Sequence, residues 1–181
     1  MVASDKPLFA KTANDLMSRK LVLLAQQMSL KGAAHLLWQA QVSGAPVVDE
    51  NGRCIGVLSS MEFLHMVEQG KQTADDSCRE AAFTSSQIMK EEEHSSCLVC
   101  EVMNRDPVTV SPNANIGELS RMMRDAHEHR VIVCDEEGRP LGLVTAMDIL
   151  SAVAQQYQAE QFQQESAPHQ SMVDELFDLV R

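Results

Sequence analysis

The chain is poor in aromatic residues, in basic relative to acidic residues and in long apolar stretches. Aromatic side chains make up 4% of its 181 residues, so the core has to be aliphatic. Its 15 Lys and Arg against 26 Asp and Glu give a net charge of −11, which repels phosphate backbones and anionic membranes and argues against nucleic-acid binding. No apolar run approaches the roughly 20 residues that span a bilayer, so no membrane segment is expected.

Signals for secretion and for a disulfide framework are also missing. Residues 1–7 lack the charged and apolar blocks of a signal peptide, and the five cysteines are an odd number. Cys54 and Cys134 lie in strand-like sequence, which suits reduced thiols better than disulfides. These observations predict a cytoplasmic protein.

Metal and catalytic sites have weak support in the sequence. Cys97-Leu-Val-Cys100, with His94 and Cys78 nearby, contains enough soft ligands for zinc, but no second CxxC follows. Val99 and its neighbours read as the buried side of a short helix, which gives this segment a structural role. No histidine is predicted to have a base partner and a substrate pose, so we expect neither a metal nor catalytic residues.

The strongest positive feature is an internal duplication. Residues 11–67 align without a gap on residues 97–153, an offset of 86, with 13 identities in 57 positions. Self-similarity of this kind indicates two copies of one structural unit. We refer to them as the first and second copy and expect function at the junction between them.

In each copy, segments with the apolar spacing of helices and segments with that of strands follow one another in the same order. Thr12 to Asp15 is expected to open a short helix, with the Thr12 hydroxyl accepting from the N3 amide. Strands are expected at Leu21–Leu24 and Pro107–Val110, and amphipathic helices around residues 30–37 and 116–123. Two strands joined by a glycine-containing hairpin follow, at 45–49 and 55–59 and at 131–135 and 141–145, and then a closing helix from Met61 or Met147.

The chain is therefore divided into four parts. We predict a first unit at 1–67, an acidic linker at 68–96 with a turn or two of helix near residues 81–89, a second unit at 97–153, and a Gln-rich helical extension at 154–181. The last part ends in an amphipathic helix that presents Val173, Leu176, Phe177 and Val180 on one face. Its docking partner is the chain itself, a sister subunit or another protein.

The two β-rich segments resemble the second halves of CBS domains. The resemblance rests on Ser43-Gly-Ala-Pro-Val-Val-Asp with Gly52-Arg-Cys-Ile-Gly-Val-Leu-Ser, and on Val131-Ile-Val-Cys-Asp with Gly138-Arg-Pro-Leu-Gly-Leu-Val-Thr-Ala-Met-Asp. It implies a mixed α+β fold of two tandem CBS domains, each helix-strand-helix-strand-strand-helix, packed about a pseudo-twofold axis. Such pairs, called Bateman modules, commonly form flat homodimers.

The resemblance also implies a regulatory rather than a catalytic role. In this family the clefts between the copies bind AMP, ADP, ATP or S-adenosylmethionine, no further cofactor is required, and binding modulates a partner protein. No other domain is evident in the sequence, so we expect the partner to be a separate chain. The alternative is a ligand-free platform for dimerisation or protein interaction.

Thr145 and Asp148 form the principal candidate site. A threonine that ends a strand and an aspartate in the first turn of the next helix present a hydroxyl and a carboxylate to one cleft, and a ribose diol offers two donors to such a carboxylate. The family pattern places the ribose here. The same spacing is also typical of a helix cap, and sequence alone leaves that reading open.

The remaining candidates surround this pair and its counterpart in the first copy. The resemblance places phosphate contacts at His129 and Arg130, and the guanidinium of an arginine binds two phosphate oxygens at once. The alternative is a solvated basic turn that balances Glu128 and Asp125. Glu62 replaces aspartate after Ser59, which predicts a weaker second site. The residues expected to line adenine are Val108, Thr109, Val110, Val131 and Ile132 in the second copy and Val22, Leu23, Ala45 and Pro46 in the first.

Overall fold

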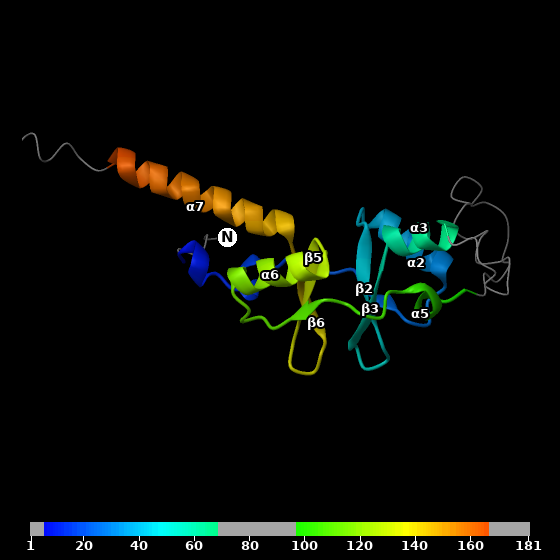
Figure 1. The fold of residues 1–181 in the computed structure, drawn as a ribbon. Helices are drawn as coiled ribbons and strands as arrows, with labels where there is room; N and C mark the ends of the chain where they lie inside the picture. The colour runs from blue at the N-terminus through cyan, green and yellow to red at the C-terminus, as the bar shows by residue number, and fades with distance from the viewer. Residues whose placement is uncertain (1–5, 69–96, 167–181) are drawn as a thin grey trace, which may run out of the picture.

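A computed structural model describes residues 6–68 and 97–166. Two lobes stand side by side, each with a three-stranded sheet covered by helices, and a long helix extends away from the second lobe (Figure 1). The first lobe contains β1 (Leu24–Ala25), α2 (Leu30–Gln39), β2 (Gly44–Val48), β3 (Cys54–Ser59) and α3 (Ser60–Glu68). The second contains β4 (Thr109–Val110), α6 (Ile116–Ala126), β5 (Arg130–Cys134), β6 (Pro140–Thr145) and α7 (Ala146–Ser166).

The two sheets have the same topology and register. β1 runs parallel to β2 and β2 antiparallel to β3, and β4, β5 and β6 repeat this pattern. Val47 pairs with Gly56 in one sheet and Val133 with Gly142 in the other, in agreement with the offset of 86. The hairpin turns contain Gly52 at φ +77° and Gly138 at φ +80°, which confirms the predicted need for glycine there.

Local capping sets the start of the amphipathic helices. The Ser29 Oγ accepts a hydrogen bond from the Gly32 amide at 3.2 Å before α2, and the Asn115 Oδ1 accepts from the Glu118 amide at 3.0 Å before α6. Both helices bury the face that the apolar spacing predicts. The buried residues are Leu30, Ala33 and Leu37 in α2 and Ile116, Leu119 and Met123 in α6.

The opening segments of the two copies exchange places. The short helix η1 (Leu8–Ala10) precedes the first copy, α1 (Ala13–Leu16) opens the first copy, and α5 (Val99–Val102) opens the second. Ala13 and Met17 are nevertheless buried in the core of the second lobe, whereas Val99 and Met103 are buried in the core of the first. Each hydrophobic core is therefore completed by the other sequence repeat.

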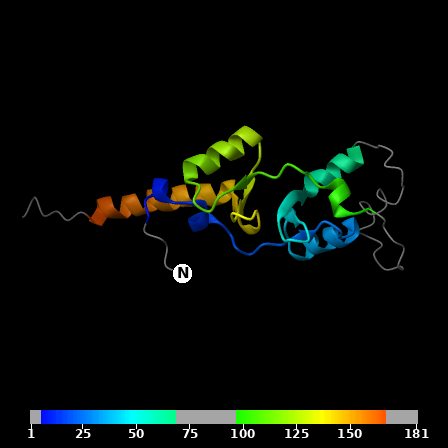
Figure 2. The same cartoon turned by 90° about the horizontal axis from the view of Figure 1, so that it is seen from below.

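Backbone hydrogen bonds fix this exchange in two equivalent places. The Ser18 amide donates to the Leu143 carbonyl at 2.9 Å, and the Leu143 amide donates back to Ser18 at 3.0 Å. Val57 and Asn104, which are the repeat equivalents of Leu143 and Ser18, exchange two bonds of 2.9 Å. The view from below shows the two segments that connect the lobes, one blue and one green, each running from one lobe to the other (Figure 2). The lobes are therefore related by a pseudo-twofold axis, as expected for the fold class.

This exchange shortens the two opening strands relative to their predicted lengths. Residues 18–23 cross between the lobes, so the strand expected at Leu21–Leu24 forms only at Leu24–Ala25, and its counterpart forms only at Thr109–Val110. The capping box predicted at Thr12 is present, and the Thr12 hydroxyl also donates to the Asp15 carboxylate at 2.9 Å. The helices predicted near residues 81–89 and 171–180 lie outside the described residues.

The sheets meet at the junction through the faces that point away from their own helices. Val131 and Val133 belong to the core of the second lobe, and Ile132 lies on the opposite face because side chains alternate along a strand. Ile132 is nevertheless only 2% exposed. Pro46, its repeat equivalent, is also buried. The junction thus buries the middle of β2 and of β5.

Candidate functional site

Thr145 and Asp148 lie at the start of α7 and are joined by three hydrogen bonds. The Thr145 amide and hydroxyl both donate to Asp148 Oδ2 at 2.7 Å, and the Asp148 amide donates to the Thr145 hydroxyl oxygen at 3.2 Å. Both side chains are half-buried. Among the described residues no donor contacts the second carboxylate oxygen, Oδ1. The cap uses one oxygen of Asp148 and leaves the other available to a ligand.

The first copy repeats this arrangement with a longer side chain. The Ser59 amide and hydroxyl donate to Glu62 Oε2 at 2.6 Å, and the Ser59 hydroxyl oxygen accepts from the Met61 amide at 3.2 Å. The extra methylene of Glu62 is therefore accommodated by a cap of the same form. Both acids stand in the first turn of a helix, where the helix dipole favours a negative charge.

A cation reaches across the junction beside the principal pair. Arg130 pairs with Thr145 in the β5–β6 register, and its Nη2 donates to the Ser43 hydroxyl of the first copy at 2.9 Å. The exposed His129 precedes it, and the His129 carbonyl accepts from the Ala146 amide at the start of α7. The structure thus brings His129, Arg130, Thr145 and Asp148 to one end of the second sheet.

The residues expected to line adenine fall into two groups. Val131, Val110 and Ala45 are buried in the cores of their lobes, and Ile132 and Pro46 are buried at the junction. The others are partly accessible: Val22 and Val108 are half-buried, and Leu23 and Thr109 are exposed. The Val108 carbonyl already accepts a hydrogen bond from the Ile132 amide at 2.9 Å.

A surface depression that sequence analysis did not predict lies at the end of α2. Its volume is about 520 Å³, and it is lined by Leu37, Trp38, Gln39, Gln41, Val42 and Ser43. Trp38 is 76% exposed and stacks on His35 with ring centroids 6.3 Å apart. Ser43 connects this depression to Arg130 of the second copy. An isolated exposed tryptophan on an otherwise amphipathic helix was the available sequence signal.

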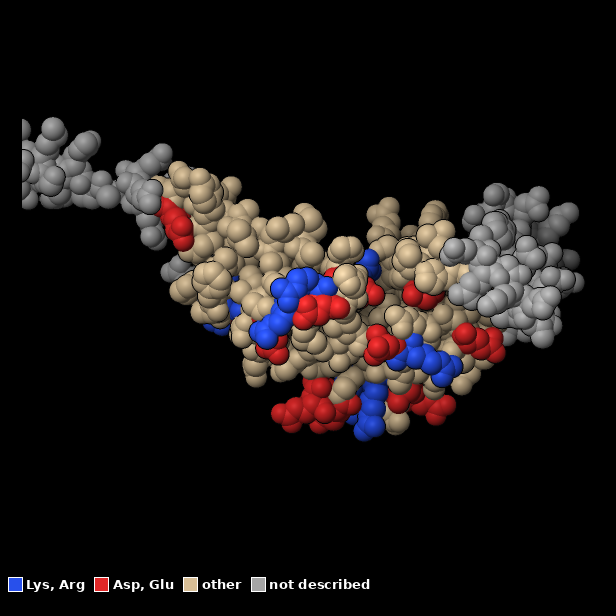
Figure 3. All heavy atoms as spheres, in the orientation of Figure 1, with Lys and Arg blue, Asp and Glu red and all other residues tan. Residues whose placement is uncertain are grey.

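The space-filling view relates charge to this arrangement. The surface is hollowed between the α7 side of the second lobe and the α2–α3 side of the first, and acidic and basic side chains lie across the front of both lobes and at the opposite edge of the molecule (Figure 3). Residues 6–68 and 97–166 contain no group of three His, Cys, Asp or Glu side chains arranged to hold a metal ion. Cys78 and His94 lie outside this part of the chain.

Duplicated sheets, exchanged opening helices and a Thr/Ser-x-x-acid pair at the start of each closing helix define a tandem CBS pair. The sequence model of the CBS domain matches residues 13–68 and 99–155. The chain belongs to the CBS domain family. None of the helices in the described part of the chain is long and apolar enough to cross a membrane.

Two curated relatives illustrate the extent of the sequence similarity. The uncharacterized protein MJ1404 of Methanocaldococcus jannaschii is 30% identical over 109 residues, which are 60% of this chain and 21% of that protein. The chloroplastic CBS domain-containing protein CBSX2 of Arabidopsis thaliana is 23% identical over 153 residues, or 80% of this chain and 64% of that protein. The chain therefore spans less than two thirds of the length of each.

Solved structures share the whole two-lobed fold. The crystal structure of CBSX2 in complex with AMP matches with a TM-score of 0.60 at 22% identity, covering 80% of this chain and 96% of that one. The CBS domain pair of protein MJ0100, in complex with 5′-methylthioadenosine and S-adenosyl-L-methionine, matches with a TM-score of 0.62 at 20% identity, covering 80% and 97%. At these identities the likeness is one of fold.

Proposed function

We propose that this protein is a regulatory module that binds an adenosine-containing ligand at the junction of its two copies and thereby modulates a partner protein. The observation that carries the proposal is the meeting of Thr145, Asp148 and Arg130 at one end of the second sheet, with Arg130 extending to the first copy. AMP, ADP, ATP and S-adenosylmethionine are the candidate ligands. CBS pairs of similar fold carry AMP or S-adenosylmethionine in their crystal structures, which supports this choice.

Asp148 supplies the proposed sugar contact. Its Oδ2 holds the start of α7, and the ribose diol donates to Oδ1, a charged acceptor that makes hydrogen bonds roughly twice as strong as neutral ones. Helix capping and ligand binding are then two uses of one carboxylate rather than alternatives. Adenine is proposed to lie beside Val108 and Thr109, the accessible members of its predicted lining, with Val110, Val131 and Ile132 beneath.

Arg130 supplies the proposed phosphate contact. Its bond to the Ser43 hydroxyl joins two partly solvated groups, so exchanging it for a charged phosphate costs little and gains a bidentate ion pair. The exposed His129 adds a second donor beside it. The equivalent positions in the first copy are Ser43 and Gly44, which carry no charge. We therefore assign phosphate-containing ligands to the site of the second copy.

A weaker second site is proposed around Ser59 and Glu62. As at Asp148, no donor among the described residues contacts the second carboxylate oxygen of Glu62, but this carboxylate stands one methylene further out and crowds the sugar. Leu23 and Val22 are the accessible members of its predicted adenine lining, with Ala45 and Pro46 buried behind them. Without a cation, this site favours an uncharged adenosine derivative over a nucleotide.

Calorimetric titration of ligand-stripped protein with AMP, ATP and S-adenosylmethionine tests the proposal. Asp148→Ala is expected to weaken binding of the nucleotide by about 1.5–3 kcal/mol, roughly 10- to 150-fold. Glu62→Ala is the matched control, because it removes the equivalent cap from the other copy and leaves the principal site intact. Unchanged affinity in Asp148→Ala overturns the site, and absence of heat with all three ligands favours the ligand-free platform.

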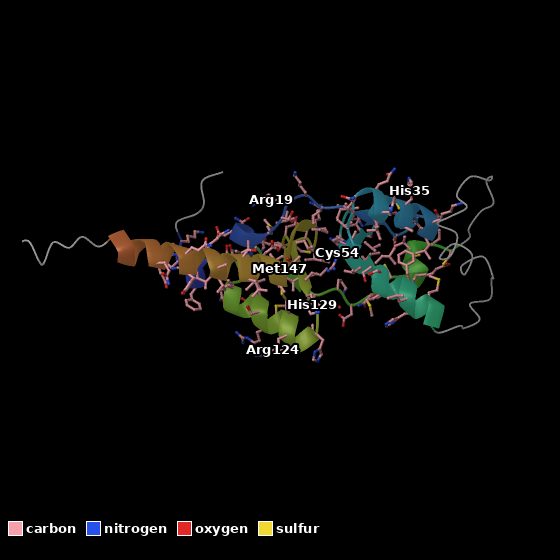
Figure 4. All side chains as sticks on the ribbon, turned by 90° about the horizontal axis from the view of Figure 1, so that it is seen from above. Arg19, His35, Cys54, Arg124, His129 and Met147 are labelled. Atoms are coloured by element: carbon pink, nitrogen blue, oxygen red, sulfur yellow. The ribbon has the colours of Figure 1, made fainter. Side chains whose placement is uncertain are left out.

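We further propose that the protein forms a homodimer through an apolar face on α3 and α7. Met61 and Leu64 of α3 are 53% and 58% exposed, and their repeat equivalents Met147 and Leu150 of α7 are 66% and 59% exposed. Val153 continues this face. Because repeat-equivalent residues supply both halves, the face is self-complementary about a twofold axis, which is the geometry that a second copy of the chain satisfies. α3 and α7 are both visible from above (Figure 4).

The remaining parts of the proposal follow from this role. We infer a non-catalytic protein without a required cofactor, whose regulated partner is a separate chain. A cytoplasmic setting is proposed because Cys54, Cys100 and Cys134 are thiols rather than disulfides, the form that a reducing compartment maintains.

A further inference from the structure

Two cysteines from different copies meet at the hairpin end of the sheets. Cys54 begins β3 of the first copy and Cys134 ends β5 of the second, and their side chains are neighbours that interact electrostatically. The Cys54 thiol donates a hydrogen bond to the Gly56 carbonyl at 3.6 Å. The backbone fixes the approach, because the Cys54 amide donates to the Gly138 carbonyl at 2.9 Å. Arg139 Nε also contacts the Asn51 carbonyl at 3.4 Å. The two hairpin turns thus hold these sulfurs together, and Figure 4 places Cys54 between the lobes.

The pair has the unequal environments that thiol–disulfide exchange uses. Cys54 is half-buried, whereas Cys134 is buried and 8% exposed, so a reagent in solution reaches Cys54 first. The contact with Cys134 lowers the pKa of Cys54, and the same contact together with burial raises the pKa of Cys134. Cys54 is therefore the nucleophile, because the thiolate is the reactive form. Cys134 is placed to resolve the adduct.

We propose that Cys54 and Cys134 form a reversible disulfide that covalently joins the two copies at the hairpin end of their sheets. The oxidant is a small disulfide such as oxidised glutathione. The Cys54 thiolate attacks one of its sulfurs, forms a mixed disulfide and releases the first glutathione thiolate. Cys134 then gives its proton to solvent, attacks the Cys54 sulfur and expels the second. The two cysteine sulfurs lose two electrons, which the oxidant accepts.

The position of the bridge determines what it restrains. Cys54 stands at one end of β3 and Ser59 at the other, a separation of about 17 Å along a strand at ~3.3 Å per residue. The disulfide therefore forms far from Thr145, Asp148 and Arg130 and leaves their chemistry unaltered. It does, however, prevent the lobes from separating at the hairpin end. The two copies, otherwise joined by the polypeptide linker and by non-covalent contacts, become cross-linked at this end as well.

The repeat equivalents of the two cysteines are Pro140 and Val48. The thiol pair therefore occurs once in the molecule and is not imposed by the duplication. Val48 also supplies a matched substitution, since Cys134→Val places in the second copy the residue that the first copy already holds at this strand position.

Incubation of the reduced full chain with oxidised glutathione, followed by proteolysis and mass spectrometry, tests the proposal. We expect a peptide pair linked through Cys54 and Cys134 with the loss of two hydrogens, and a rise of about 5 °C in the unfolding temperature that dithiothreitol reverses. Cys54→Ser and Cys134→Val should abolish both effects, and Cys100→Ser should abolish neither.

Three results overturn the proposal. One is a stable glutathione adduct on Cys54 that Cys134 never displaces, and another is a bridge that uses a different cysteine. The third is an oxidised protein that unfolds at the temperature of the reduced one. Because this experiment contains no adenosine ligand, its outcome is independent of the ligand-binding proposal.

Discussion

Met17 of the first copy packs directly against Gly142 in the sheet of the second. A Cβ atom built on Gly142 would lie 2.7 Å from the Met17 Cγ and 2.9 Å from its Cβ, closer than real Cβ contacts. Met17 is only 8% exposed, so it has little space into which to move. Glycine is required at position 142 by this close approach rather than by a positive φ.

Replacing this glycine should therefore weaken the fold. We expect Gly142→Ala to lower the free energy of unfolding by about 1–3 kcal/mol, as overpacked core positions do. Gly56→Ala, its repeat equivalent, should cost more, because its added Cβ meets the Asn104 carbonyl oxygen at 2.7 Å as well as Met103, and backbone yields less readily than a methionine side chain. Urea unfolding measures both, and an unaltered midpoint in either variant contradicts the packing.

The second sequence copy should not fold by itself. A fragment of residues 97–166 lacks Ala13 and Met17, which are buried in its core. We expect it to show no cooperative thermal transition by circular dichroism. Adding a peptide of residues 6–23 should restore the transition, whereas the same peptide with Met17→Asp should not. A fragment that unfolds cooperatively alone would disprove the dependence.

Asp15 should make stability depend on pH. Hydrogen bonding from the Thr12 backbone, followed by the contact with Lys6, holds the pKa of Asp15 below its ordinary value of 3.8. Because the folded pKa is depressed, its stabilisation is complete above 3.8 and is lost as the pH falls through the lower folded value. At pH 7 Asp15→Asn should cost about 1 kcal/mol, a typical cap contribution.

The pH dependence of the stability difference between the wild type and Asp15→Asn is the more stringent test. The difference between the wild type and Asp15→Asn, measured by urea unfolding from pH 7 downward, should shrink below pH 3.8. Asp106→Asn, at an exposed position, is the control. A difference that stays constant over the whole range would show that the charge of Asp15 is not the source of the effect.

Exchange of the acids between the copies tests which features set the strength of each site. We expect Asp148→Glu to weaken nucleotide binding about tenfold, because the carboxylate moves outward while the cap is kept, as Glu62 shows in the first copy. Glu62→Asp should strengthen binding of an uncharged adenosine derivative to the other site. Calorimetry measures the ligand affinity of both variants. Affinities equal to those of the wild type would show that the length of the acidic side chain does not determine the affinity of either site.

The apolar face on α3 and α7 should control the oligomeric state. Leu150→Asp places a charge at its centre and is expected to shift the protein from dimer to monomer in sedimentation experiments. Leu141→Asp, at another exposed apolar position on β6, is the control and should leave the dimer intact. A monomeric wild type, or a dimeric Leu150→Asp, would exclude this face as the interface.

Much of the architecture is predictable from local sequence. The hairpins follow from glycine after Asp49 and Asp135, whose Oδ1 atoms accept from backbone amides in both turns. The longer helices follow from apolar residues three and four apart. These features depend on interactions within about ten residues. Because the sequence is duplicated, each local signal occurs in both copies.

The exchange of opening segments was not predicted from the sequence. Leu16, Met17 and Met103 look equally buried whether they pack on their own copy or on the other, since hydrophobic spacing shows that a residue is buried but not what covers it. For the same reason, the contacts of Arg130 with Ser43 and of Cys54 with Cys134 were not predicted. Each joins residues 80 or more positions apart, and only the relative placement of the lobes brings them together.

The crossing of the two opening segments has a consequence for biosynthesis. As the polypeptide leaves the ribosome, the first sheet is complete at Ser59, but its interior stays open until Val99 and Met103 have emerged. Residues 13–17 likewise remain exposed to solvent until the core that they join has been synthesised as far as Val144. The first lobe can therefore close only after Met103 has emerged, so a nascent chain interrupted between the copies exposes an incomplete apolar core rather than half of a working protein.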